Sequence, residues 1–190
     1  MRGIPALPAM VIASLCGPGF LLAQDRHWTA PRKTTIPLTA QAPVLDGRLD
    51  DAAWTNASRL TNFLDLKRLK RTVAEQTTVW IMRDSQRLYA AFACESHDPA
   101  AIRADTPREA RDSPRLHEED TVSLLLDPER SQNDCYQWTV NAQGAILDQV
   151  LHRLVYTERM VPSPEWSSRA EAAGARGDGR WCVELAIPFS

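Results

Sequence analysis

Short runs of β-branched, aromatic and aliphatic residues recur between residues 77 and 187, and clusters of polar turn residues separate them. Every second residue from Trp181 to Ile187 is large and apolar, and Tyr136, Trp138 and Val140 alternate with polar residues in the same way. A period of two is typical of a strand that buries one face. The pattern therefore predicts strands at 77–82, 88–94, 121–126, 136–140, 145–151 and 181–187.

The connections between these runs predict how the strands are joined. Residues 83–87 and 141–144 are hairpin-sized, and residues 174–180 hold three glycines, which predicts a third hairpin turn. Residues 124–126 are all leucine, and a run that is apolar on both faces favours a central strand. Short strands with turns at this spacing predict an all-β, antiparallel β-sandwich of the immunoglobulin-like kind.

Two segments lie outside the strand pattern. Residues 98–120 contain eleven Asp, Glu and Arg residues and three prolines, which predicts a long surface loop of the kind that often carries function. Upstream, Asp46 and Gly47 form a turn signal before a short helix that carries Trp54, which we interpret as a core residue.

The first 23 residues have the order of a secretory signal peptide. Arg2 precedes a weakly apolar run that ends in Leu-Leu-Ala before Gln24. The stretch 17–19 (Gly-Pro-Gly) interrupts this run, so it falls short of the roughly 20 apolar residues that a spanning helix needs. We therefore expect a signal peptide at 1–23, a leader at 24–42 and a domain at 43–190, with a secreted, periplasmic or cell-surface location and no membrane insertion after cleavage.

Composition narrows the function classes. The 190 residues are 44% hydrophobic and 24% charged with a formal net charge of −2, which excludes overall disorder and gives no general attraction to nucleic acid. Three cysteines, Cys94, Cys135 and Cys182, remain beyond the predicted signal peptide and permit one disulfide whose pairing stays open. No nucleophile elbow or phosphate-binding loop occurs, so no catalytic residue is predicted and whether the chain is an enzyme stays open.

Five motifs occur in an order that resembles the family 9 carbohydrate-binding modules (CBM9) and the wider group of DOMON-like sandwiches. They are Val-Leu-Asp-Gly at 44–47 with Asp-Asp-Ala-Ala-Trp at 50–54, Leu-Tyr-Ala-Ala-Phe at 88–92, Glu-Asp-Thr-Val at 119–122 before Leu-Asp-Pro at 126–128, Tyr-Gln-Trp-Thr-Val-Asn at 136–141, and Ile-Pro-Phe at 187–189. The resemblance covers residues 43–190. In the family, further strands follow Ile-Pro-Phe, so the resemblance implies that this domain is incomplete.

The resemblance also implies where a sugar would bind. In sugar-binding members, two tryptophans clamp the ligand and charged or amide side chains contact its hydroxyls. His117 stands at the first clamp position, Ser123 and Thr139 stand where the pattern has Glu and Arg, and Asn141 is kept. Aromatic rings suit the apolar C–H face of a pyranose. The predicted ligand-binding residues are His117, Trp138, Asn141 and Trp166.

Cofactor expectations follow from the same resemblance. Family members carry structural calcium, and oxygen ligands suit that ion, so Asp112, Asp120 and Asp127 are candidate ligands, with solvated loop carboxylates as the alternative. Some DOMON-like sandwiches hold haem b between Met and His, but Met82 fits a core position better, so haem is not expected. The remaining residues that could ligate haem are Met160, His97, His117 and His152.

Three functional hypotheses remain. The first is an exported carbohydrate-binding module within a larger polysaccharide-processing protein, such as one with a glycoside hydrolase domain. The second is a spacer or interaction sandwich at the N-terminus of an outer-membrane-associated protein, which the residues at Ser123 and Thr139 favour. The third, a haem b electron-transfer domain, is the weakest of the three.

Overall fold

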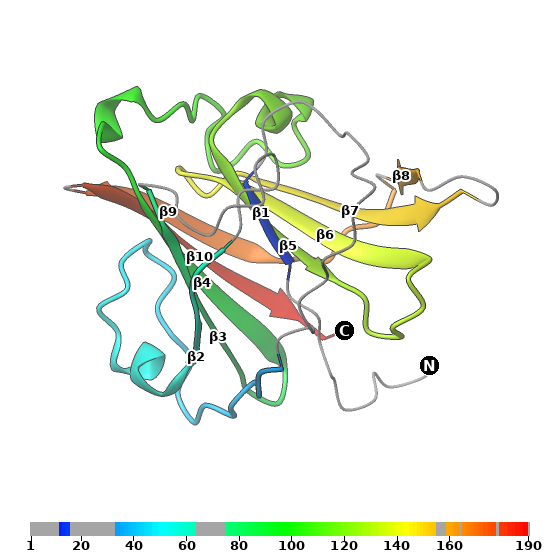
Figure 1. The fold of residues 1–190 in the computed structure, drawn as a ribbon, viewed down its shortest axis with the longest axis horizontal. Coiled ribbons are helices and arrows are strands. Elements are labelled where there is room, and N and C mark those ends of the chain that lie inside the picture. Colours follow the sequence, from blue (N-terminus) through cyan, green and yellow to red (C-terminus); the bar gives the residue numbers. More distant parts are fainter. Residues whose placement is uncertain are drawn as a thin grey trace.

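The computed structural model describes residues 12–15, 33–63, 75–154, 159–163, 165–177 and 179–189. Its strands form two five-stranded antiparallel sheets that pack face to face (Figure 1). The helical elements of the described part are short 3-10 turns: η1 (Ala52–Asn56), η2 (Pro99–Ala101) and η3 (Pro114–Glu118). The predicted all-β sandwich is confirmed.

The first sheet has the order β1-β5-β6-β7-β8 and the second has the order β2-β3-β4-β10-β9. The strands of the first sheet are β1 (Ile12–Leu15), β5 (Thr121–Leu126), β6 (Asp134–Asn141), β7 (Ile146–Arg153) and β8 (Met160–Ser163). Those of the second sheet are β2 (Ser58–Leu60), β3 (Thr77–Arg83), β4 (Arg87–Glu95), β9 (Glu171–Gly177) and β10 (Arg180–Pro188).

All six predicted strands are present, and the hairpin expected within residues 174–180 joins β9 to β10, but its turn is shorter than predicted. Most of residues 174–180, predicted as a turn, belong to β9, which pairs with β10 along its length. Strand β9 reads Glu-Ala-Ala-Gly-Ala-Arg-Gly, and alanine and glycine carry no strand signal. A close approach explains the glycine at 174, because a Cβ there would lie 2.6 Å from the carbonyl oxygen of Ala142 in the β6–β7 turn.

The inner faces of the two sheets form the main core. Large side chains that are essentially buried meet there: Val122, Leu124, Trp138 and Val140 from the first sheet, and Val79, Ile81, Leu88, Phe92, Trp181, Val183 and Leu185 from the second. Burying a Val, Leu, Ile or Phe side chain stabilises a fold by about 1.5–3 kcal/mol. The alternation seen in the sequence is therefore the division between this core and the outer faces.

A second apolar cluster covers the outer face of the second sheet. Trp54 on η1 is buried there beside Met82, Tyr89 and other apolar residues, which confirms its interpretation as a core residue. Glu184 of β10 is completely buried beneath this segment. Its carboxylate accepts the indole N–H of Trp54 at 2.8 Å and the backbone N–H groups of Asp46 and Gly47 at 3.0 and 2.9 Å. One carboxylate thus attaches the turn and the helix to the sheet.

The three described cysteines are free. Cys94 faces the core from β4, whereas Cys182 lies on β10 between the core residues Trp181 and Val183 and points to the opposite face. Cys135 lies on the other sheet. Because these side chains diverge, the disulfide that the sequence permits does not form among them.

Strand β1 comes from the segment predicted to be a signal peptide. Its backbone pairs antiparallel with β5, with Ile12 opposite Leu125 and Leu15 opposite Val122, so β5 lies inside the first sheet (Figure 1). The rest of residues 1–23 lies outside the described residues, and cleavage after Ala23 stays a prediction. Within the described ranges, no helix is long and apolar enough to cross a membrane.

Candidate functional site

Four polar side chains form two neighbouring cross-strand pairs on the outer face of the first sheet. The strand register places Ser123 opposite Thr139 and Gln137 opposite Gln149. The Ser123 Oγ and Thr139 Oγ1 atoms are 2.9 Å apart, and the Gln149 Nε2 donates to the Gln137 Oε1 at 2.8 Å. We call these four residues the hydroxyl–amide row. The Glu and Arg positions implied by the family resemblance are thus direct neighbours, but a hydroxyl pair fills them.

The strand residues that adjoin the row on this face are uncharged. The nearest residues along β5, β6 and β7 on the same face are Thr121, Leu125, Cys135, Asn141, Leu147 and Leu151. Ser123, Thr139 and Gln149 are buried, whereas Gln137 is half-buried. The row therefore offers both donors and acceptors without a formal charge, and Gln137 is its accessible end.

The helical turn η3 is packed on this same face. Leu116 is completely buried against Ala145 and Leu147, and the next residue, His117, is exposed. Ser113 precedes the turn and Pro114 is its first residue, where the fixed backbone angle of proline suits a helical start. The structure therefore places the predicted His117 on an element anchored to the face that carries the row.

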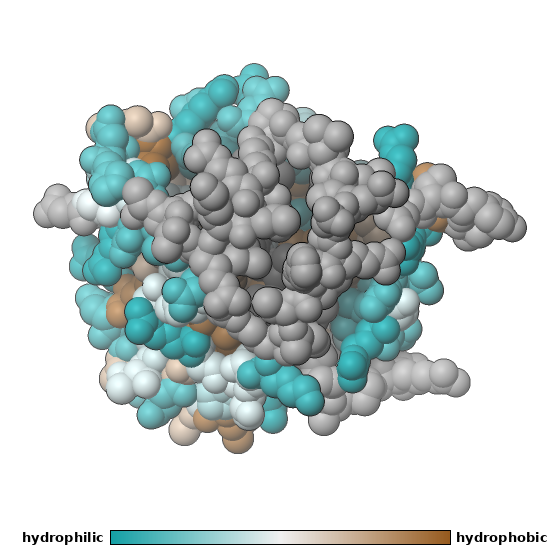
Figure 2. Space-filling view, in the orientation of Figure 1, coloured by the Kyte–Doolittle hydropathy of each residue, from teal (hydrophilic) through white to brown (hydrophobic). Residues whose placement is uncertain are grey.

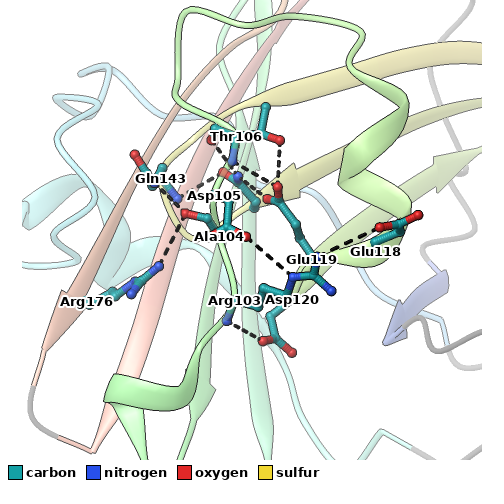
Figure 3. A network of polar contacts seen from close by, with 10 residues as sticks. Arg103, Ala104, Asp105, Thr106, Glu118, Glu119, Asp120, Gln143 and Arg176 are labelled. Atoms are coloured by element: carbon teal, nitrogen blue, oxygen red, sulfur yellow. Dashed lines mark hydrogen bonds and ion pairs between the residues drawn. The ribbon is translucent and has the colours of Figure 1, made fainter.

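A buried carboxylate holds the end of the 98–120 loop (Figure 3). Glu119 accepts the N–H and the hydroxyl of Thr106 at 2.9 and 2.6 Å, and the side-chain amide of Asn141 at 2.7 Å. Burial alone would raise the pKa of Glu119, but these hydrogen bonds outweigh it and lower the pKa. Asn141 also donates to the Thr106 carbonyl and accepts the N–H groups of Gln143 and Ala145. Its amide is fully engaged inside the protein, and its predicted sugar contact stays a prediction.

Further bonds fix the same stretch of loop to its neighbours. Arg103 donates its N–H to the Asp120 carboxylate at 2.7 Å, and Asp120 returns its own N–H to the Arg103 carbonyl at 2.8 Å. The Ala104 carbonyl accepts the side chains of Gln143 and Arg176, as Figure 3 shows. The loop is therefore attached to the β6–β7 turn and to β9. On the face that Figure 2 shows, the described residues are mostly hydrophilic with scattered apolar spots.

A second anchor of the loop lies on the inner face of the first sheet. Arg111 donates to the Asp148 carboxylate at 3.2 Å and to the Ala170 carbonyl at 2.7 Å. Asp148 is completely buried and accepts the backbone N–H of Ser168 at 2.8 Å and its hydroxyl, while its Oδ1 has no hydrogen-bond partner among the described residues. The Ser168 hydroxyl also accepts the indole N–H of Trp138 at 2.7 Å.

The four predicted ligand-binding residues separate into two places. Trp138 is buried in the core on the inner face of β6, and the half-buried Trp166 packs against it edge-on, with ring centroids 5.7 Å apart. The ring centroids of Tyr136 and Trp166 are 4.8 Å apart. His117 and Asn141 belong instead to the outer-face side of the sheet. The structure thus brings the two tryptophans together and keeps them apart from the other pair.

The three predicted calcium ligands serve separate turns. Asp112 accepts the Asp148 N–H at 3.2 Å, Asp120 accepts the Arg103 N–H, and Asp127 accepts two N–H groups of the turn that follows it, at 3.1 and 2.7 Å. Among the described residues, no group of three or more His, Cys, Asp or Glu side chains could hold a metal ion. Calcium stays a prediction that these contacts do not support.

Several residues of this region were missed by the motif comparison. Gln137 lies inside the quoted 136–141 motif but was given no role, and Gln149 lies in no quoted motif, although the β6–β7 hairpin pairs the two residues directly. Tyr136 and Asp148 were assigned no role beyond the strand pattern. The Asp148 contacts cannot be read from a pattern, because Arg111 and Ser168 lie 37 and 20 residues away in the chain.

Comparison with known proteins places the fold in a class. No family model matches the chain, and no curated protein matches it. Among solved structures, its sandwich is similar to that of carbohydrate-binding modules. In particular, it resembles a CBM9 from Caldicellulosiruptor kristjanssonii in complex with cellotriose, at 18% identity and a TM-score of 0.53, over 82% of this chain and 67% of that one.

Two further structures give the same picture. The C. kristjanssonii CBM9 in complex with glucose matches at 18% identity with a TM-score of 0.53, over 82% of this chain and 69% of that one. A candidate carbohydrate-binding protein from Bacteroides uniformis matches at 13% identity with a TM-score of 0.56, over 80% of this chain and 71% of that one. The CBM9-like fold expected from the motifs is therefore confirmed.

Proposed function

We propose that this protein binds carbohydrate on the outer face of the first sheet. The observation that carries the proposal is the hydroxyl–amide row, in which two cross-strand pairs of uncharged hydrogen-bonding side chains lie side by side. Sugar hydroxyls both donate and accept, and so do serine, threonine and glutamine. The half-buried Leu125 on the same face offers apolar surface to C–H groups. The likeness to a CBM9 solved with cellotriose and glucose supports this choice of ligand.

The replacements at Ser123 and Thr139 shape the proposed binding. Shorter neutral side chains keep hydrogen-bonding capacity but lose the charge and reach of the Glu and Arg that the family pattern has there. Hydrogen bonds to charged groups are stronger than those between neutral groups. We therefore expect weak binding that begins at the half-buried Gln137, with His117 as a rim contact.

A glutamine pair makes a matched test. Gln137→Ala removes a group of the row, whereas Gln86→Ala removes an exposed glutamine in the β3–β4 turn of the other sheet. In titrations with cello- and xylo-oligosaccharides followed by tryptophan fluorescence, we expect Gln137→Ala to weaken binding roughly fivefold, the effect of about 1 kcal/mol for one hydrogen bond. The Gln86→Ala variant should match the parent. Equal affinity in both variants would refute the site.

A spacer domain without sugar binding is the second candidate. It is favoured by the direct bond between Ser123 and Thr139, since hydroxyls that satisfy each other in a buried place do not need a ligand. It predicts no saturable response to any sugar of the panel. Under the leading proposal, the protein is exported and forms part of a larger polysaccharide-processing protein, which the sequence of the complete gene product would test.

A further inference from the structure

The inner face of the first sheet carries a second group of ligand-competent side chains at the ends of β6, β7 and β8. Tyr136 is opposite Val150, and Asp134 is opposite His152 one row further along the same face. The His152 Nδ1 and the Asp134 Oδ1 are 2.9 Å apart. Trp166 packs on Tyr136 with its ring inclined by 48°. We call Tyr136, Trp166, Asp134 and His152 the aromatic shelf.

The shelf is accessible and has unused hydrogen-bonding groups. The side chains of His152 and Asp134 are 52% and 61% exposed, and both aromatic residues are half-buried. In the part of the chain that the structure describes, neither the Tyr136 hydroxyl nor the Trp166 indole N–H forms a hydrogen bond, whereas the neighbouring Trp138 indole donates to Ser168. Such groups usually find a partner when they are buried, and here they stay available at a surface.

The protein holds Trp166 in place. The chain two residues further on is attached by Ser168, whose N–H and hydroxyl both bind the buried Asp148 carboxylate. Arg111 adds a bond to the Ala170 carbonyl. The edge-on contact with Trp138 fixes the ring from the other side. A ring positioned in advance loses little conformational freedom when a ligand stacks on it.

We infer that the aromatic shelf is a second carbohydrate contact, which takes one pyranose ring on Trp166. The C–H face of the ring would lie on the indole, and its hydroxyls would meet Tyr136, His152 and Asp134. A wholly apolar ligand would leave the His152–Asp134 pair desolvated, and an anion would meet the Asp134 carboxylate. A neutral polyol with one apolar face satisfies both halves of the shelf.

The shelf is distinct from the hydroxyl–amide row, because even-numbered and odd-numbered residues of β6 point to opposite faces of the sheet. A single sugar ring cannot contact both Tyr136 and Gln137, so short oligosaccharides should bind at two sites per chain. The inference rests on the proposed carbohydrate binding and extends it to a second face.

Two single substitutions in the shelf distinguish it from the hydroxyl–amide row. Tyr136→Phe keeps the ring and removes only the hydroxyl, and His152→Ala removes an exposed partner. With cellotriose in isothermal titration calorimetry, we expect the parent to bind two molecules per chain. Each shelf variant should weaken one of the two sites roughly fivefold, and Gln137→Ala should weaken only the other.

The outcomes distinguish the inference from the proposed function. One molecule per chain, with an affinity that responds to Gln137→Ala and not to the shelf variants, overturns the shelf and leaves the row as the site. The reverse pattern supports the shelf and refutes the row. No binding of any oligosaccharide by the parent overturns both. Melting temperatures equal to that of the parent show that the variants report on binding and not on folding.

Discussion

The Glu184 carboxylate accepts the indole N–H of Trp54 at 2.8 Å, although 130 residues separate them in the chain. The same carboxylate binds the Asp46 and Gly47 N–H groups. We expect Glu184→Ala to cost about 3 kcal/mol or more of unfolding free energy, because each buried donor left unpaired costs about 1–3 kcal/mol. Trp54→Phe removes one donor from Glu184 and should cost less. Urea unfolding measures both changes.

Glu171→Ala is the control for this carboxylate. Glu171 is exposed, and among the described residues it forms an ion pair with the half-buried Arg87. Surface ion pairs contribute about 0–1 kcal/mol, so this variant should unfold like the parent. Glu184 is proposed to hold the segment from Asp46 to Trp54 on the sheet. A loss of unfolding free energy in Glu184→Ala no larger than that in Glu171→Ala would contradict this role.

The buried Glu119 carboxylate should make the folded protein less stable in acid. Its pKa in the folded protein is lowered, so the unfolded chain binds the proton more readily. The stability from this group is present above the ordinary Glu pKa of about 4.3 and is lost as the pH falls through the folded-state value. Glu119→Gln should therefore flatten the decline in unfolding free energy on acidification. Glu118→Gln, at its exposed neighbour, should keep the slope of the parent. If the unfolding free energy declines equally steeply with falling pH in the parent and in both variants, Glu119 is not the source of the acid sensitivity.

The pKa of Glu184 is shifted in the opposite direction from that of Glu119. Burial raises its pKa despite the three hydrogen bonds, so the folded protein holds this proton more tightly than the unfolded chain. Its titration contributes stability below the ordinary carboxyl pKa, and this contribution is lost as the pH rises through the folded-state value. In urea unfolding over a pH series, Glu184→Gln should remove this decline. A decline that persists unchanged in that variant would assign it to another group.

The glycine at 174 sets the distance between the two sheets near the β6–β7 turn. A Cβ on Gly174 would lie 2.6 Å from the Ala142 carbonyl oxygen and 2.9 Å from the Gly144 nitrogen, whereas one on Gly177 would meet its nearest atom at 3.9 Å. Gly174→Ala should destabilise the fold by about 1–3 kcal/mol, as overpacking does. Gly177→Ala on the same strand should change stability little. Thermal unfolding of the two variants tests this difference.

The cysteines should differ in reactivity. Burial raises the pKa of the Cys94 thiol to about 12 and also raises the pKa values of Cys135 and Cys182. The thiolate is the reactive form, so alkylation of the native protein should reach the half-buried Cys135 first and Cys94 last. Mass spectrometry of alkylated peptides measures this order. A disulfide among these three cysteines in the unreduced protein would contradict it.

The sequence predicted the strands better than it predicted the site. Alternation marks which residues of a strand share a face, and Trp138 alternates as expected. It does not say which face meets the other sheet, so Trp138 could be taken for a ligand contact although it is a core residue. Strand β9 was missed because its alanines and glycine pack closely without a hydrophobic pattern. The role of Asn141 was hidden because its partners, Thr106 and Glu119, belong to the polar loop.

The attachments of the 98–120 loop restrict where residues can be inserted into it. Long surface loops ordinarily tolerate insertions, because each added residue costs little entropy. Here Arg111 is bound to Asp148 on one face of the sheet, Leu116 is buried on the other, and Glu119 is bound to Asn141 only three residues later. An extra residue between Arg111 and Glu119 would release one of these attachments and move His117. Natural length variation in this loop is therefore expected before Arg103 and not after Arg111.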